Sequence, residues 1–129
     1  MRNRQMSNEP AISHDPMYQL LREGNINEFN AKKQAGEYCN LKSCDFRSLD
    51  LQGIDAVGLD FRGAYFRMTD LRGIDFRGSL LDGASINGAK ISGTYFPVEI
   101  SAQEILLSLE HGTRLRVNRV KKKKKTNKI

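Results

Sequence analysis

The sequence contains no tryptophan and only three prolines, and aromatic residues make up 8% of its 129 residues. A chain of this length forms at most one domain with one modest core, and few large rings are available to fill it. No apolar run reaches the 18 or more residues of a membrane span, and the start of the chain lacks the apolar centre of a signal peptide. We therefore expect a soluble, cytoplasmic protein without a membrane span.

Cysteine is scarce as well, since the chain has only Cys39 and Cys44. Two cysteines agree with a reducing compartment, because small secreted domains usually carry more. The pair has the spacing C-x4-C, with no second pair and no nearby histidine. Closed zinc sites need four ligands, so we expect neither a metal site nor a bound cofactor.

The net charge of +6 comes entirely from the C-terminal part of the chain. Residues 1–38 carry five basic and five acidic residues, and residues 39–98 carry seven of each. Residues 99–129 carry nine basic and three acidic residues. The basic character therefore belongs to the tail and not to the body of the protein.

An apolar residue returns every five positions through the middle of the chain, at positions called here the core positions. Eight of the eleven glycines stand two places after a core position, and the residue two places before it is nearly always small or apolar. A spacing of two fits a short extended segment, and glycine fits a corner between such segments. The pattern predicts a polygonal coil whose turns stack by backbone hydrogen bonds about 4.8 Å apart. The twelve core positions are Leu41, Phe46, Leu51, Ala56, Phe61, Phe66, Leu71, Phe76, Leu81, Ile86, Ile91 and Phe96.

The units CDFRS, IDAVG, LDFRG, TDLRG and IDFRG resemble the A-(D/N)-L-x-x pattern of the pentapeptide repeat family. The resemblance covers twelve consecutive units over residues 39–98. It implies an all-β solenoid, namely a right-handed quadrilateral β-helix with four units per coil and about three coils. We expect short flanking α-helices at both ends, because the open ends of such a stack need a cover.

The flanking sequences contain helix signals. Asp15 fits an N-cap and Pro16 the first helical position, and a second short helix follows with Ile26 and Phe29 on one face. After the repeats, a helix is predicted that ends at Gly112. Ser101 and Glu104 form a capping-box pattern at its start. Its apolar face comprises Ile105, Leu106 and Leu109.

These signals divide the chain into five parts. They are a flexible N-terminus (1–14), a helical N-terminal cap (15–38), the repeat β-helix (39–98), a C-terminal helix (99–112) and a basic, largely disordered tail (113–129). By resemblance to the family, the C-terminal helix either closes the coil or mediates a homodimer. We favour closure of the coil.

No grouping of residues in the sequence indicates catalysis. The only histidines are His14, in the expected flexible segment, and His111, at a helix end. The many aspartates have a structural explanation as outward polar residues of the coil. We therefore expect a protein without enzymatic activity.

The arginines that follow core positions permit two interpretations. One is a stripe that binds phosphate. The other is a ring of ion pairs, because successive units face different sides and an aspartate stands two residues before most of these arginines. We favour the ring of ion pairs. The arginines are Arg47, Arg62, Arg67, Arg72 and Arg77.

Two candidate binding surfaces remain. A protein-partner surface would use the outward residues Tyr65, Arg67, Met68 and Leu80, although scattered surface apolar residues are also normal. A polyanion-binding segment would use the tail, which binds RNA, DNA or anionic lipid without reading sequence, or else only keeps the protein soluble. Its cations are Arg114, Arg116, Arg119, Lys121, Lys122, Lys123, Lys124, Lys125 and Lys128.

The sequence favours a non-enzymatic, bacterial pentapeptide repeat protein that acts as a small protein-binding scaffold for an unknown partner. Nucleic-acid or ribosome association through the tail is the first alternative. The second comes from the resemblance, since some family members imitate duplex DNA and modulate DNA gyrase. Against the second, the repeat segment is electrically neutral and three coils are short for imitating a duplex.

Overall fold

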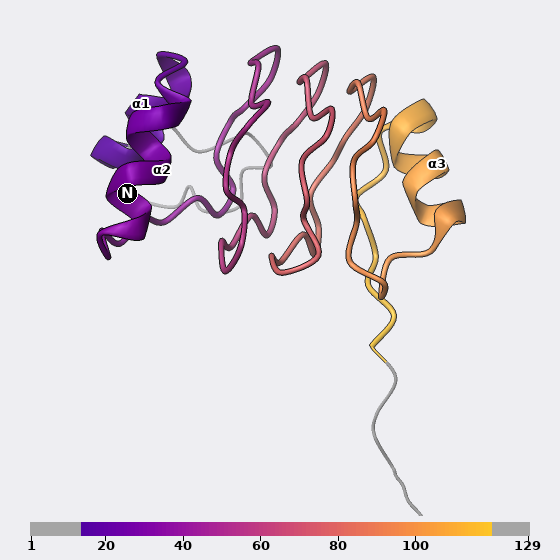
Figure 1. Cartoon of the computed structure of the whole chain (residues 1–129). Helices are drawn as coiled ribbons and strands as arrows, with labels where there is room; N and C mark the ends of the chain where they lie inside the picture. Colours follow the sequence, from indigo (N-terminus) through magenta and orange to yellow (C-terminus); the bar gives the residue numbers. More distant parts are fainter. Residues whose placement is uncertain (1–13, 120–129) are drawn as a thin grey trace, which may run out of the picture.

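The computed structural model of the chain describes residues 14–119. This part of the protein consists of three helices and a stack of coils (Figure 1). Helices α1 (Pro16–Arg22) and α2 (Ile26–Gln34) lie at one end of the stack, and α3 (Ala102–His111) lies at the other. None of the described helices has the length and hydrophobicity that a membrane span requires.

Between the helices the chain returns to the same place every twenty residues. Parallel bridges record this register, for example between Asp45 and Tyr65 and between Tyr65 and Ser85. Because each unit has five residues, four units complete one coil, and units twenty residues apart stack in four columns. The first column holds the units of Leu41, Phe61 and Leu81; the second, Phe46, Phe66 and Ile86; the third, Leu51, Leu71 and Ile91; the fourth, Ala56, Phe76 and Phe96.

The described residues contain no continuous β-strand, which differs from the all-β class expected from the repeats. The reason is the shortness of each extended segment. A corner follows each core position, as at Gly73 with a φ of 76°, so pairing is limited to six isolated bridges. The coils are nevertheless joined by backbone hydrogen bonds, such as that from the N–H of Phe61 to the carbonyl of Leu80 at 2.9 Å.

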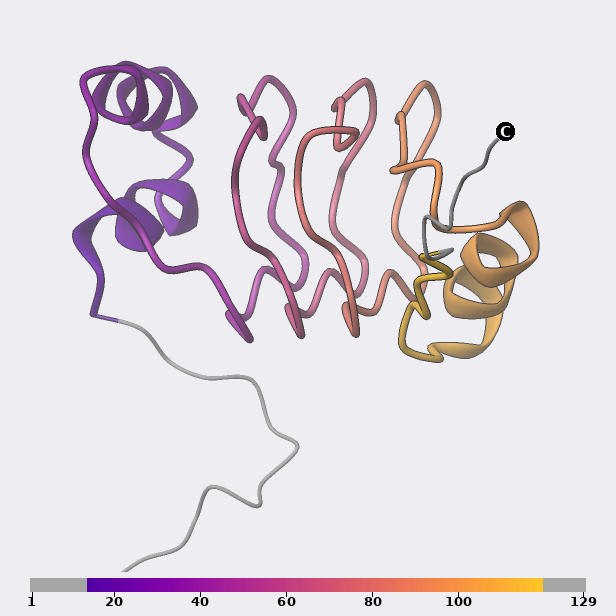
Figure 2. The same cartoon turned by 90° about the horizontal axis from the view of Figure 1, so that it is seen from below.

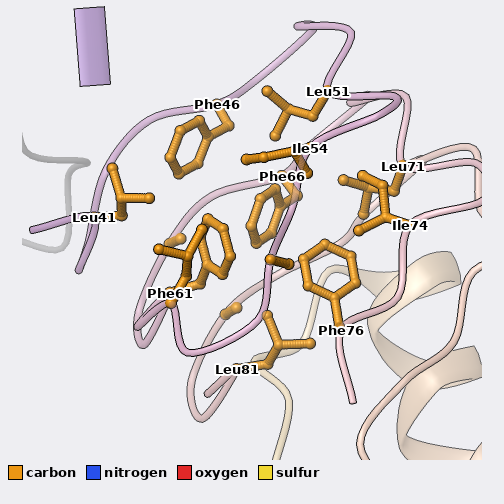
Figure 3. Packing of buried hydrophobic residues seen from close by; sticks show 14 of the residues in the cluster. Leu41, Phe46, Leu51, Ile54, Phe61, Phe66, Leu71, Ile74, Phe76 and Leu81 are labelled. Atoms are coloured by element: carbon orange, nitrogen blue, oxygen red, sulfur yellow. The ribbon is translucent and has the colours of Figure 1, made fainter. Parts of the chain in front are cut away.

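The core positions point into the stack and fill it (Figure 3). Ten of the twelve are buried, and Ile91 and Phe96 in the last coil are half-buried. Phenylalanine rings touch between coils and within a coil: the centroids of Phe46 and Phe66, one coil apart, lie 5.3 Å apart in a stacked pair, and those of Phe61 and Phe76, in the same coil, lie 5.7 Å apart edge to face. The five-residue period therefore identifies the core correctly.

The two N-terminal helices supply hydrogen bonds that a preceding coil would have supplied. Asp15 caps α1 as predicted, with its side chain accepting from the N–H of Met17 at 2.8 Å. The hydroxyl of Tyr18 donates to the carbonyl of Asp45 at 2.7 Å. In α2, Asn30 donates to the carbonyl of Gly53 and accepts from the N–H of Asp55, both at 2.9 Å.

Helix α3 covers the other end, in a different rotation from the predicted one. Leu106, predicted on the inner face, is 53% exposed, and Ser108 is buried instead. The helical period explains this, since Ile105, Ser108 and Leu109 share one face and Leu106 lies about 100° away from Ile105. Ile105 and Leu109 pack against the core cluster.

The capping box expected at the start of α3 forms only in half. The Ser101 side chain accepts from the N–H of Glu104 at 3.1 Å, as predicted. The Glu104 carboxylate binds Arg116 instead of reaching back to Ser101. Its electrostatic partner thus comes from the segment that follows the helix.

Residues 113–119, expected to belong to a largely disordered tail, pack against the last coil beside α3 (Figure 2). Leu115 is buried; its carbonyl accepts from the N–H of Gly83 at 2.8 Å, and its N–H donates to the carbonyl of Ala84 at 2.7 Å. The N–H of Asn118 donates to the carbonyl of Glu99 at 2.9 Å. The segment is ordered because Leu115 has a core to enter and the coil end has groups to pair. Residues 1–13 and 120–129 lie outside the described residues.

Candidate binding surfaces

Aspartate–arginine pairs decorate the outside of the coils. In the third column Arg72 donates to the two carboxylate oxygens of Asp70, from Nε at 2.9 Å and from Nη2 at 2.7 Å. The same two-residue spacing gives three further pairs. This confirms the predicted ion pairs, because residues immediately before and after a core position share the outward face. The further pairs are Asp45–Arg47, Asp60–Arg62 and Asp75–Arg77.

The arginines hold these carboxylates in their charged form. The side-chain hydrogen bond from Arg77, with the backbone N–H of Arg77 second, lowers the pKa of Asp75 to about 2. The corresponding arginine lowers the pKa of Asp45, Asp60 and Asp70 as well. Each of these carboxylates is therefore ionised at neutral pH and held by the arginine two residues later.

The predicted protein-partner surface is only partly assembled by the fold. Tyr65, Arg67 and Met68 lie in the second column, and Met68 is 58% exposed. Leu80 lies in the first column, where it is paired with Asp60. The twenty-residue register places Leu80 on a different side of the coils from the other three.

The predicted polyanion-binding segment is also altered by the fold, because each of its described arginines has a partner. Arg114 donates to the carbonyl of Gly83 at 2.7 Å and to the hydroxyl of Tyr65 at 2.5 Å. Arg116 binds Glu104, and Arg119 binds Asp82 at 2.5 Å. These three arginines therefore belong to the folded body. Lys121, Lys122, Lys123, Lys124, Lys125 and Lys128 lie outside the described residues.

The structure adds a surface that the sequence interpretation missed, in the fourth column. Val57, Tyr95 and Val98 are 60%, 54% and 88% exposed. The guanidinium of Arg77 lies over the ring of Tyr95, 4.3 Å from its centroid. A signal was present in the sequence, because Tyr95 stands where most units have an aspartate or asparagine, and Val98 stands at a corner position.

The surroundings of the two free thiols disfavour their ionised form. Cys44 is buried, and burial raises its pKa to about 11. Burial raises the pKa of the half-buried Cys39 thiol too. Both thiols stay protonated at neutral pH, whereas the thiolate is the reactive form. Within residues 14–119, no three histidine, cysteine or acidic side chains are grouped so as to hold a metal ion.

Comparison with known proteins identifies the repeats themselves. The family model for pentapeptide repeats matches the chain in eight copies, over residues 39–78 and 60–96. No curated protein and no solved structure matches the chain. The matched residues coincide with the five-residue period and with the coil stack. Residues 39–96 thus place this chain among the proteins that contain pentapeptide repeats.

Proposed function

We propose that the repeats form a right-handed quadrilateral β-helix of three coils that acts as a non-enzymatic protein-binding scaffold. The four columns and the twenty-residue register support the four-sided form. The hand of the helix follows from the family. Helix α3 closes the stack, since Ile105 and Leu109 pack inward and leave no continuous apolar face for a second copy.

The apolar residues of the fourth column carry the proposal of a protein partner. Val57 comes from the first coil and Tyr95 and Val98 from the third, and each exposes more than half of its surface. Tyrosine and arginine are enriched among the residues that dominate protein interfaces, and the exposed valines add apolar surface around them. The stacked Arg77 orients the Tyr95 ring, so part of the ordering cost of binding is met before a partner arrives.

The paired aspartates support a non-enzymatic role. Each outward aspartate of the four pairs binds the arginine two residues later, and that contact accounts for its charge and its position. These contacts hold the arginines at regular positions on the outside of the coils, and a regular surface suits recognition of another molecule.

The test is affinity capture from a cell lysate with the full-length protein and two double variants. Val57→Asp with Val98→Asp places charge on the fourth column, where both side chains are exposed, and thermal melts check that the variant folds. The matched control, Gln52→Asp with Ser92→Asp, adds the same charge at exposed positions of the third column. Captured proteins are identified by mass spectrometry after nuclease treatment.

We expect a protein that is captured by the wild type and by the third-column variant but lost with the fourth-column variant. When the captured protein is purified and titrated, its affinity for the Val57→Asp with Val98→Asp variant should be at least tenfold lower than for the wild type. Capture that is indifferent to both variants, or the absence of any captured protein, overturns the proposal.

A further inference from the structure

The second column collects arginines that are far apart in the sequence. The bridge between Asp45 and Tyr65 places Arg47 and Arg67 on the same outward face, one coil apart. Adjacent coils are separated by about 4.8 Å. Four successive units face four directions, but units twenty residues apart face the same direction, so a row of cations along one column is possible.

Helix α1 extends this row at its N-terminal end. Arg22 is exposed, and its Nη1 lies 3.4 Å from the hydroxyl of Tyr18, which itself donates to the carbonyl of Asp45. A hollow of about 340 Å³ opens here, lined by Tyr18, Gln19, Arg22 and Asp45. The hollow is thus continuous with the second column and has a guanidinium on its wall.

The segment after α3 extends the row at its C-terminal end. The guanidinium of Arg114 lies over the ring of Tyr65, 5.0 Å from its centroid. It is fixed by its hydrogen bonds to Tyr65 and Gly83. Arg67 is held from the last coil, since its Nη1 donates to Oδ1 of Asn87 at 2.6 Å.

The charge of this column stands out against a nearly neutral body. Residues 14–119 contain thirteen arginines and lysines against fourteen aspartates and glutamates. The second column and its two extensions contain four arginines, Arg22, Arg47, Arg67 and Arg114, and one acidic residue, Asp45. In the third column the outward charges cancel. They are Asp50, Asp70, Arg72 and Lys90.

We propose that the second column binds the phosphate backbone of a single-stranded nucleic acid. Guanidinium groups match phosphate oxygens in planar, two-point hydrogen bonds. Each has five N–H donors, and the structural contacts described for Arg22 and Arg67 use one donor each. Their exposed positions leave the remaining donors directed at solvent, where a phosphate can reach them.

One apolar side chain in the same column favours a single strand over a duplex. Met68 follows Arg67 directly and is more than half exposed, whereas the Tyr65 ring is covered by Arg114. Exposed bases pack on aromatic and apolar side chains, whereas the bases of a duplex are stacked inside it. A narrow row of cations flanked by such side chains is the arrangement that tracks one strand.

The occupant is expected to be long and anionic, because the arginines of the second column follow one another from α1 to the segment after α3. A polymer of phosphates can engage several of them at once, each contact releasing counterions. This inference is independent of the fourth-column protein surface, and either can fail alone.

The experiment measures binding of the full-length protein by fluorescence anisotropy. The probes are a labelled single-stranded oligonucleotide of about twelve nucleotides, the duplex of the same length, and a polyglutamate peptide. The test variant is Arg22→Gln with Arg67→Gln, and the matched control is Lys42→Gln with Lys90→Gln, which removes the same charge from other columns. A further pair of proteins carries glutamine at Lys121 to Lys125, with and without the test substitutions. Thermal melts check that every variant folds.

We expect the test variant to bind the single strand about tenfold more weakly at low salt, and the slope of log affinity against log salt to fall by about 1.4, or 0.7 per lost phosphate contact. The control should stay within about twofold of the wild type. The same tenfold loss should persist when the lysines are replaced. Equal losses in test and control variants, or a loss that vanishes with the lysines, overturn the proposal. Equally tight duplex binding rejects the single strand, and column-dependent binding of polyglutamate alone assigns the surface to an acidic protein.

Discussion

The hydroxyl of Ser108 accepts a hydrogen bond from the backbone N–H of Ile86 at 3.0 Å, in a fully buried position. One coil earlier, the equivalent N–H of Phe66 donates to a backbone carbonyl, that of Ser85, at 2.8 Å. Helix α3 therefore replaces, with one side chain, an acceptor that a further coil would have provided. The carbonyl of Leu109 does the same for the N–H of Gly88 at 3.0 Å.

Replacing Ser108 by alanine should destabilise the protein. The substitution removes the acceptor of a buried N–H, which costs about 1–3 kcal/mol of unfolding free energy. Urea denaturation followed by circular dichroism measures the change. Ser92→Ala is the matched control, because Ser92 is exposed and no contact of its hydroxyl is described. Equal stability of the two variants would show that solvent satisfies the Ile86 N–H.

Leu115 is the anchor of the segment that follows α3. Leu115→Ala should lower the unfolding free energy by about 2–5 kcal/mol, as is usual for a buried leucine, and should release residues 113–119 from the coil. The expected result is a new protease cleavage site near Leu115 together with the lower stability. Leu106→Ala is the control, since Leu106 is largely exposed. A segment equally resistant to protease in both variants would contradict the anchoring role.

Two glycines at the same position of their units should respond in opposite ways to alanine. Gly73 has a φ of 76°, and a Cβ atom there would meet no atom within 4 Å, so Gly73→Ala adds only backbone strain of about 1–2 kcal/mol. Gly78 lies outside the left-handed region, and its Cβ would make an ordinary contact of 3.6 Å with Val57. Gly78→Ala should be neutral or stabilising by up to about 1 kcal/mol. Thermal melts of both variants decide this, and similar losses at both sites would be inconsistent with the two backbone conformations.

The Asp75–Arg77 pair should titrate in acid. The pKa of Asp75 is lowered from 3.8 to about 2, mainly by the hydrogen bond from Arg77. Folding thus favours the ionised form, so the pair stabilises the folded state above pH 3.8, and the stabilisation disappears as the pH falls through about 2. NMR titration should place the Asp75 midpoint near 2 in the wild type and closer to 3.8 in Arg77→Gln. An unchanged midpoint in Arg77→Gln would assign the shift to another cause.

The repeats could be predicted from sequence because their information is local. The alternation within each unit decides which side chain points inward, so the burial of Phe61 or Leu71 follows from five neighbouring residues. The left-handed corners follow similarly, with Gly78 and Val98 as the two exceptions. The column membership of Leu80 follows from the four units per coil that the family resemblance implies, since this register pairs Leu80 with Asp60, twenty residues away.

The order of residues 113–119 was not predicted, because their many cations outweighed the alternating pattern of apolar residues. In residues 114–117, arginines alternate with Leu115 and Val117, which is the period of a half-buried extended segment. The abundance of cations indicated a solvated tail, although half of these side chains face the last coil. Arg22 and Arg114 could not be assigned to one surface from sequence, since α1 and the coil end are brought together only by the fold.

The twenty-residue register also determines how such a molecule can change in length. An insertion of twenty residues would add one coil and leave every later side chain facing its former direction. An insertion of five would move each later residue to the next column, so that Arg114 and Ser108 would meet the wrong partners. Related proteins should therefore differ in length by whole coils, and each added coil can lengthen the row of arginines without disturbing the surfaces beside it.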